Sequence, residues 1–201
     1  MIGYDLNKAY PRKFFNQRRS LGWRIDLVCG GIYNVYQPKS VIDFGCGNGD
    51  LLSWFYRRNI PVMGIEGTDN CRESAVIPQI LIKTIDLREP ILTYVPYDLA
   101  LCLEVAEHLE PEYAPILVDS ICKCSLRVIF TAAIPGQGGN HHVNLQEKKY
   151  WITLFSSMGF KQNEQAEIDL KKYWTPKKNV KGVKAYYQNL ICFDKKLNTI
   201  K

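Results

Sequence analysis

The sequence predicts a three-layer α/β fold, with one doubly wound sheet between two layers of helices. Two observations carry this prediction. Short apolar segments of strand length alternate with segments of helical periodicity from about residue 40 onward. A turn with glycine at every second position, residues 45–49, joins the first of these strands to a helix. With 201 residues, 46% of them hydrophobic, the chain suits one domain with a sizeable core.

The composition argues against several classes of protein. No apolar run reaches the length of a membrane span, and the N-terminus lacks the apolar segment of a signal peptide. We therefore expect a cytoplasmic protein with no membrane partner. The seven cysteines are odd in number and irregularly spaced, which argues against a disulfide framework. The net charge of +6 permits an anionic partner but does not require one.

The first predicted strand, Val41–Phe44, leads directly into the glycine turn. Glycine permits unusual backbone angles and lets a ligand approach the main chain closely. The glycine spacing is one residue shorter than the dinucleotide fingerprint. No Gly-Lys-Ser/Thr sequence follows it, which excludes a nucleoside triphosphate P-loop. The next segment, Leu51–Arg58, has the apolar stripe of a helix.

Asp43 lies in the strand, two residues before the first of three alternating glycines, and a helix follows them. This arrangement resembles motif I of the class I S-adenosylmethionine (SAM) dependent methyltransferases. The resemblance implies a seven-stranded sheet in the order 3-2-1-4-5-7-6, with strand 7 antiparallel, within a methyltransferase domain at residues 40–201. It also implies that SAM is the cofactor. The residues expected to bind SAM at the turn are Asp43, Gly45, Cys46, Gly47 and Gly49.

Residues 1–39 precede this domain, and we expect them to form an N-terminal helical extension that packs on the core. Residues 20–36 are predicted to be helical, with a break near Gly30 and Gly31. In the family this region packs over the cofactor and helps to admit the acceptor. The alternative is that it only covers one face of the sheet.

The second and third predicted strands both end in an acid. Ile60–Glu66 is apolar up to Glu66, and a carboxylate at this place hydrogen-bonds ribose hydroxyls in nucleotide sites. Ile80–Leu87 ends at Asp86. The resemblance implies that Asp86 and its neighbour Leu87 contact the amino group and the ring face of the adenine.

The remaining elements follow the same alternation. Prolines near both ends of residues 88–96 predict that a helix there is lost or reduced to a turn. Helical spacing resumes near Pro111, and Asn144 with Glu147 resembles a capping box for a further helix that Gly159 closes. The later strands are predicted at Tyr97–Leu103, Leu126–Ala133, Phe160–Glu164 and Asn189–Asp194, the last two antiparallel, with a basic loop of about twenty residues between them.

Candidate reacting groups follow the fourth and fifth strands, at the sheet edge where open α/β sheets bind ligands. Methyl transfer from a sulfonium requires alignment of the acceptor and, for a hydroxyl, removal or acidification of its proton. The sequence Glu-x-x-Glu-His at residues 104–108 is followed by a further histidine after the fifth strand. This pattern resembles the divalent-metal site of the small-RNA 3′-terminal 2′-O-methyltransferases and of the ubiquinone-pathway O-methyltransferases. The resemblance implies a Mg²⁺ or Mn²⁺ ion that lowers the pKa of the acceptor oxygen and is held by Glu104, Glu107, His108 and His142.

Three interpretations of this group remain open. It holds a metal, or His108 or His142 acts as a general base with Glu104 in the catalytic and SAM-binding site, or the side chains only form structural hydrogen bonds. His142 is the better fourth ligand because it begins the run into the next helix, and His141 is the alternative.

We expect an enzyme that methylates an oxygen of a small molecule or a saccharide. The alternative is RNA, methylated at a 2′-oxygen with the Glu/Glu/His/His metal site. Residues 171–184 interleave cations with Tyr173 and Trp174, which could track phosphates and stack bases, or stack on a sugar. A solvated charged face is the plainer interpretation of this segment. A SAM-binding module without methyl transfer is a further hypothesis. No Asn/Asp-Pro-Pro-Tyr/Phe motif follows the fourth strand, which argues against amino methylation of DNA.

Overall fold

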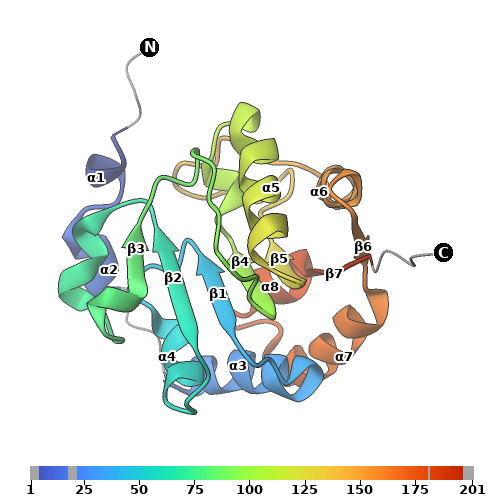
Figure 1. The fold of residues 1–201 in the computed structure, drawn as a ribbon. Coiled ribbons are helices and arrows are strands. Elements are labelled where there is room, and N and C mark those ends of the chain that lie inside the picture. Colours follow the sequence, from blue (N-terminus) through green and yellow to red (C-terminus); the bar gives the residue numbers. More distant parts are fainter. Residues whose placement is uncertain (1–4, 18–21, 181, 197–201) are drawn as a thin grey trace.

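The computed structural model describes residues 5–17, 22–180 and 182–196. Its sheet has the order β3-β2-β1-β4-β5-β7-β6, and helices cover both faces (Figure 1). Neighbouring strands from β3 through β5 are parallel, whereas β7 runs antiparallel to both β5 and β6. The predicted fold class, strand order and antiparallel strand are therefore confirmed. No helix in the described part of the chain is long and apolar enough to span a bilayer.

Every strand overlaps the segment in which the sequence predicted it, and most are shorter. The strands are β1 Val41–Phe44, β2 Val62–Glu66, β3 Ile82–Thr84, β4 Leu99–Leu103, β5 Arg127–Thr131, β6 Phe160–Gln162 and β7 Ile191–Lys195. The central strands β1 and β4 are buried along their whole length, because helices cover both of their faces.

The helices occupy the connections between the strands. The α-helices are α1 Leu6–Ala9, α2 Arg12–Gln17, α3 Gly22–Tyr36, α4 Asp50–Tyr56, α5 Ala114–Cys124, α6 Lys148–Ser157, α7 Glu164–Trp174 and α8 Lys184–Asn189. Short 3₁₀ helices are η1 Asp69–Ser74, η2 Gln79–Leu81, η3 Ala106–His108, η4 Pro111–Tyr113 and η5 Thr175–Lys177. Residues 88–96 contain no helix, as their prolines predicted.

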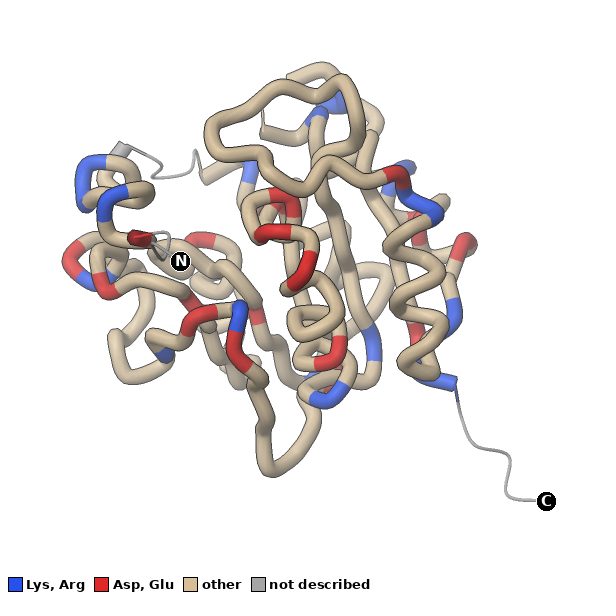
Figure 2. Tube along the Cα trace, turned by 90° about the horizontal axis from the view of Figure 1, so that it is seen from above, with Lys and Arg blue, Asp and Glu red and all other residues tan. Residues whose placement is uncertain are grey.

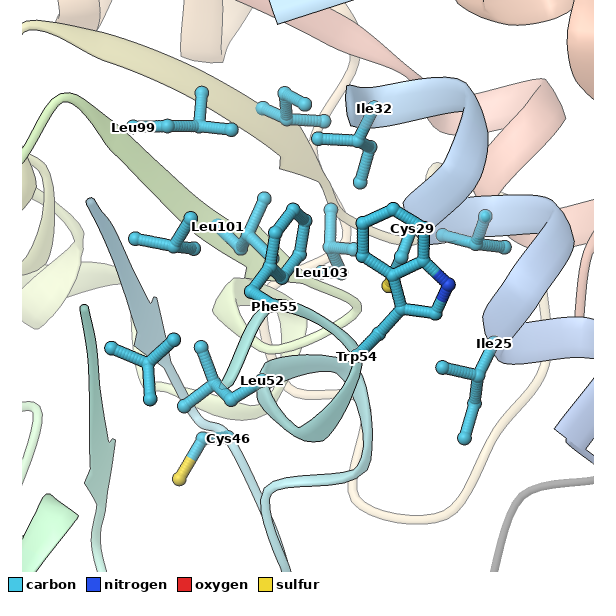
Figure 3. Close-up of a cluster of buried hydrophobic side chains, with 14 of the residues drawn as sticks. Ile25, Cys29, Ile32, Cys46, Leu52, Trp54, Phe55, Leu99, Leu101 and Leu103 are labelled. Atoms are coloured by element: carbon cyan, nitrogen blue, oxygen red, sulfur yellow. The ribbon is translucent and has the colours of Figure 1, made fainter. Parts of the chain in front are cut away.

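Alternating strand residues build two cores, one on each face of the sheet. One core joins α3, α4 and α7 to residues such as Leu99, Leu101 and Leu103 of β4; Figure 3 shows these leucines facing Trp54 and Phe55 of α4 and Ile32 of α3. The other core joins α5 and α6 to the intervening residues of the same strands. The sheet is therefore fixed from both sides, and its upper edge in Figure 1, where the parallel strands end, remains for the site.

Helix α3 is continuous, so the predicted break near Gly30 and Gly31 is wrong. Position 31 requires glycine because α3 packs closely against α7 there. A Cβ atom at position 31 would lie 3.0 Å from Nε1 of Trp174 and 3.1 Å from Cβ of Tyr173. Ser20, the first residue of the predicted helix, lies outside the described residues.

Substitution of the two adjacent glycines is expected to change the free energy of unfolding in opposite directions. Gly31→Val is expected to lower the free energy of unfolding by about 2 kcal/mol, because the added methyl groups overpack the contact with Trp174. Gly30→Ala has open space around it and should raise that free energy by about 0.5–1 kcal/mol through helix propensity. Urea denaturation of both variants measures the difference, and equal midpoints would contradict this account of α3.

The predicted capping box of α6 is also wrong. The N-cap of α6 is Glu147, without a side-chain capping bond. Asn144 is instead buried three residues earlier, where its N–H donates to the carbonyl oxygen of Glu107 at 3.1 Å. Tertiary contact with the segment after β4 thus replaces the expected capping box. Gly159 does follow the helix, with φ of +84°.

The predicted basic loop before the last strand is largely helical. Helix α7 extends to Trp174, η5 follows, and α8 begins at Lys184. Trp174 is fully buried against α3, so it cannot be the stacking platform that the sequence suggested. Tyr173 remains 44% exposed. Lys181 lies outside the described residues.

Candidate active site

The glycine turn after β1 requires its glycines. Gly45, Gly47 and Gly49 have φ of +75°, +57° and +82°, which L-residues rarely adopt. At position 45 a Cβ atom would also lie 2.5 Å from a methyl carbon of Val105, which follows β4. The N–H groups of Gly45 and Cys46 both donate to the carbonyl oxygen of Ile65. The turn is therefore held between the ends of β2 and β4.

Glu66, at the end of β2, reaches directly to this turn. Its Oε2 accepts a hydrogen bond from the N–H of Gly47 at 2.8 Å, and its Oε1 accepts one from the N–H of Gly67 at 2.9 Å. Cys46 is buried with its thiol against Gly64 of β2. The predicted SAM residues of the turn and of β2 thus lie together.

Asp43 of β1 is almost completely buried beside this group. Burial, with a smaller contribution from the Glu66 carboxylate, raises the pKa of Asp43 well above its ordinary value. The folded protein therefore binds a proton at Asp43 over a pH range in which the unfolded chain has lost it.

The raised pKa of Asp43 makes the free energy of unfolding depend on pH. The unfolded state binds fewer protons than the folded state from about pH 4 upward, so the free energy of unfolding falls as pH rises through that range. Asp43→Asn should remove this decrease. The free energy of unfolding of the variant, minus that of wild type, should therefore be larger at pH 8 than at pH 5. Urea denaturation at both pH values tests it; parallel pH profiles for the two proteins would contradict it.

Asp86, predicted to contact the adenine, is bound by Arg88. The guanidinium donates from Nη2 to Oδ2 at 2.6 Å and from Nε to both carboxylate oxygens at 3.0 Å. Burial opposes ionisation of Asp86, but the hydrogen bonds from Arg88 outweigh it and keep the pKa of Asp86 below its ordinary value. Leu87 is buried. The sequence reasoning overlooked Arg88, although an opposite charge two residues from Asp86 was visible.

Glu104 follows β4 in a left-handed conformation, with φ of +57°, and the structure holds this backbone firmly. Its N–H donates to both the carbonyl oxygen and Oγ1 of Thr131, at 3.0 and 2.9 Å. Its side-chain Oε1 accepts a hydrogen bond from Nδ2 of Asn189 at 3.1 Å. A non-glycine residue in this region stores strain, which is common in functional sites.

Glu107, His108 and His142 come together although 34 residues separate the two histidines in the chain. One potential ligand atom of each lies within 4.8 Å of the others. Glu107 is fully buried in η3, and its carbonyl oxygen accepts hydrogen bonds from the N–H groups of Val143 and Asn144. These backbone bonds attach the histidine loop to the end of β4. We call these three residues the Glu-His-His cluster.

The surroundings of both imidazoles determine their tautomer. Nδ1 of His108 lies 3.2 Å from the carbonyl oxygen of His141, and Nδ1 of His142 lies 3.3 Å from that of Gln137. A carbonyl oxygen only accepts, so Nδ1 carries the hydrogen in each ring and Nε2 is the acceptor nitrogen of the neutral ring. That nitrogen can receive a proton or bind a metal. His141 contributes its carbonyl oxygen, and its side chain is exposed.

The N-terminal segment lies beside both halves of the site. The ring of Phe15 is 4.0 Å from the Cβ position of Gly47, and the ring of Tyr10 packs edge-on to His108 at 6.1 Å. Asn70 of η1 donates from Nδ2 to the carbonyl oxygens of Asn7 and Tyr10. Helices α1 and α2 therefore approach the turn, whereas α3 covers one face of the sheet.

Several of the predicted acids lie at this edge of the sheet. Glu66 is the last residue of β2, Asp86 follows β3, and Glu104 and Glu107 follow β4. Seen from above, acidic segments lie near the middle of the molecule, and both acidic and basic segments lie along its rim (Figure 2).

Comparison with known proteins shows which family the chain matches. A family model described as a methyltransferase domain matches residues 27–126, which include the turn and β1 through β4. No curated protein sequence matches the chain. Solved structures with the same fold include the sugar N-methyltransferase KedS8 from a Streptoalloteichus species, with TM-score 0.69 and 11% identity over 98% of this chain and 96% of that one.

Two further structures show the same fold. SAM-bound CalS10 of Micromonospora echinaspora, an amino pentose methyltransferase, has TM-score 0.66 and 13% identity over 98% of this chain and 99% of that one. The methyltransferase domain of a bacterial Hen1, CtHen1-C, has TM-score 0.57 and 17% identity over 91% of this chain and 100% of that one.

The fold and the matched turn thus define a methyltransferase. The chain belongs to the class I SAM-dependent methyltransferases, and SAM is its methyl donor.

Proposed function

We propose that this methyltransferase transfers the methyl group of SAM to a hydroxyl oxygen of a small molecule or a saccharide. The Glu-His-His cluster carries the proposal. It lies in the segments that follow β4 and β5, while the glycine turn follows β1, the strand next to β4. Its Nε2 atoms offer the proton acceptor that a hydroxyl requires and that an amine needs less.

We assign the donor site to the residues around the turn. Glu66 would bind the ribose hydroxyls, and Asp86 with Leu87 would contact the adenine. The turn itself, with its positive φ angles, allows the cofactor to approach the main chain. The support is geometric, because Glu66 already contacts the N–H of Gly47. The residues assigned to SAM are Asp43, Gly45, Cys46, Gly47, Gly49, Glu66, Asp86, Leu87 and Glu104.

In the proposed reaction the acceptor oxygen attacks the methyl carbon in line with the departing sulfur. The C–O bond forms, the C–S bond breaks with its electron pair moving to sulfur, and the hydroxyl proton passes to Nε2 of His108 or His142. Glu107 stabilises the imidazolium that results. The products are a methyl ether and S-adenosylhomocysteine.

The same residues fit a divalent metal, since they combine one buried carboxylate with two imidazoles. Mg²⁺ or Mn²⁺ held by Glu107, His108 and His142 would supply a Lewis acid that acidifies the acceptor hydroxyl. Glu104 remains a predicted fourth ligand, with its Oε1 hydrogen-bonded to Asn189.

The comparisons support a saccharide as the class of acceptor. KedS8 is described as a sugar N-methyltransferase and CalS10 as an amino pentose methyltransferase, and both match nearly the whole chain. The choice of oxygen rests on the cluster rather than on these proteins.

Incubation of the purified protein with methyl-labelled SAM and fractionated cell extract tests the proposal. Label should enter a polar fraction of low molecular weight and resist mild alkali, as a methyl ether does and a methyl ester does not. Label in a protein or ester fraction would contradict it. SAM binding without transfer to any fraction would favour the binding module.

RNA remains the second candidate acceptor because of the basic surface of α7 and η5. Lys177 lies 5.9 Å from the centre of the Trp23 ring, which is 41% exposed, and Tyr173 is exposed nearby. A salt series separates the two candidates. Binding to RNA should weaken steeply between 50 and 200 mM salt, by about 10³-fold if six phosphates are contacted. Binding to a neutral saccharide should hardly change.

A further inference from the structure

We propose that Asn189 is a positioning residue for methyl transfer, because its amide joins Glu104 to the loop that carries His142. The inference rests on the proposed function, since it concerns the same site. None of the motifs that predicted the site contains Asn189, which lies 85 residues after Glu104 and is the last residue of α8.

The side chain of Asn189 is buried, with 1% of its surface exposed, and it makes three hydrogen bonds to Glu104 and Gln137. Its Nδ2 donates to Oε1 of Glu104 at 3.1 Å and to Oε1 of Gln137 at 2.9 Å. Its Oδ1 accepts from Nε2 of Gln137 at 3.1 Å. Two donor hydrogens and one acceptor are therefore used, and the two amides form a reciprocal pair.

Gln137 carries the connection onward to His142. Its side-chain Oε1 also accepts from the N–H of Ile134 at 3.2 Å, which closes the start of the loop. Its carbonyl oxygen lies 3.3 Å from Nδ1 of His142. The loop is tight around this ring, because a Cβ atom on Gly139 would lie 2.2 Å from Nε2 of His142. A displacement of Gln137 would therefore move or rotate the imidazole.

Asparagine is the residue type that this position requires. The Glu104 carboxylate needs a donor, and Thr131 holds only its backbone. Aspartate has the same shape as asparagine but offers only acceptors when ionised, and its charge would repel Glu104. Protonation of that aspartate would restore one O–H donor. The exchange of Asn189 for aspartate therefore creates a defect that acid should relieve.

The decisive experiment compares Asn189→Asp with wild type in two measurements. The first is kcat with labelled SAM and the extract fraction that accepts methyl groups. We expect kcat to fall about 10–100-fold at neutral pH, the usual effect of losing a partner that orients a reacting group. The ratio of variant to wild-type kcat should rise toward one as pH falls. Asn189→Ala should lose kcat without this pH-dependent recovery.

The second measurement needs no acceptor. The chain has three histidines, so ¹⁵N NMR can resolve the tautomer of each imidazole. His142 should carry its hydrogen on Nδ1 in wild type and lose that preference in Asn189→Asp at neutral pH. Asn34→Asp, the same exchange on the exposed side of α3, is the matched control and should change neither measurement.

Wild-type kcat at every pH together with unchanged His142 signals in Asn189→Asp would overturn the proposal. A loss of kcat that follows thermal unfolding and does not vary with pH would also overturn it, by showing a structural role only. If this variant does not fold, Gln137→Glu breaks the same link from the loop and should show the same recovery in acid. A wild-type protein that methylates no hydroxyl would refute the proposed function instead, while the NMR measurement would still test the network.

Discussion

Glu66→Ala is expected to remove measurable SAM binding. SAM would lose the proposed hydrogen bonds from its ribose hydroxyls to Glu66, and the turn would lose the acceptor that now holds the N–H of Gly47. Hydrogen bonds to a charged group contribute about 1.5–3 kcal/mol each, so two of them correspond to roughly 100-fold or more in affinity. Isothermal titration calorimetry with SAM measures the change.

Glu89→Ala is the matched control, because it removes an exposed carboxylate that follows β3 and should leave the affinity for SAM unchanged. Asp43→Ala is expected to behave like Glu66→Ala, since Asp43 is buried two residues before the turn and is assigned to the same donor site. A folded Glu66→Ala protein that binds SAM as wild type does would show that the donor site lies elsewhere.

Glu107→Gln is expected to lower methyl transfer at least about 100-fold while SAM binding survives. The exchange preserves the volume of a fully buried side chain but removes the charge that stabilises an imidazolium or holds a metal. General-base catalysis alone contributes about 10²–10⁴-fold. Single-turnover transfer of labelled methyl measures the rate, and calorimetry with SAM provides the comparison.

Glu112→Gln, on the exposed part of η4, is the control and should transfer methyl groups at the wild-type rate. A chelator distinguishes the two roles of the cluster. If a metal is required, EDTA should stop transfer and added Mn²⁺ should restore it. Transfer that resists EDTA rules out the metal and leaves the general base, whereas full activity of Glu107→Gln would refute both.

The predictions that were confirmed depend on local patterns. Strands such as Val41–Phe44 are apolar runs bounded by turn residues, and the glycines after them need positive φ angles. The resemblance then supplied the order of the strands, which no local pattern contains. A residue at the end of a strand lies at the edge of the sheet, and this is why Glu66, the last residue of β2, could be predicted beside the turn.

The predictions that failed involve residues whose environment comes from a distant segment. Gly31 was taken as a helix break, whereas it admits Trp174 from α7. The segment around Trp174 was taken as a loop because of its charges and proline. Its apolar residues Ala166, Leu170 and Trp174 nevertheless recur every four positions, a helical spacing that the lysines concealed.

The class of fold and the strand ends that carry the candidate side chains could be predicted from the sequence, because both depend on neighbours in the chain, and the resemblance of the glycine turn to a known motif implied the methyl donor. Which of those side chains meet depends on tertiary packing. Packing brings His142 to Glu107 and Asn189 to Glu104, across separations of 35 and 85 residues. Buried polar groups so far apart in the chain find their partners only when the sheet forms, and the chemistry at the acceptor depends on those partners.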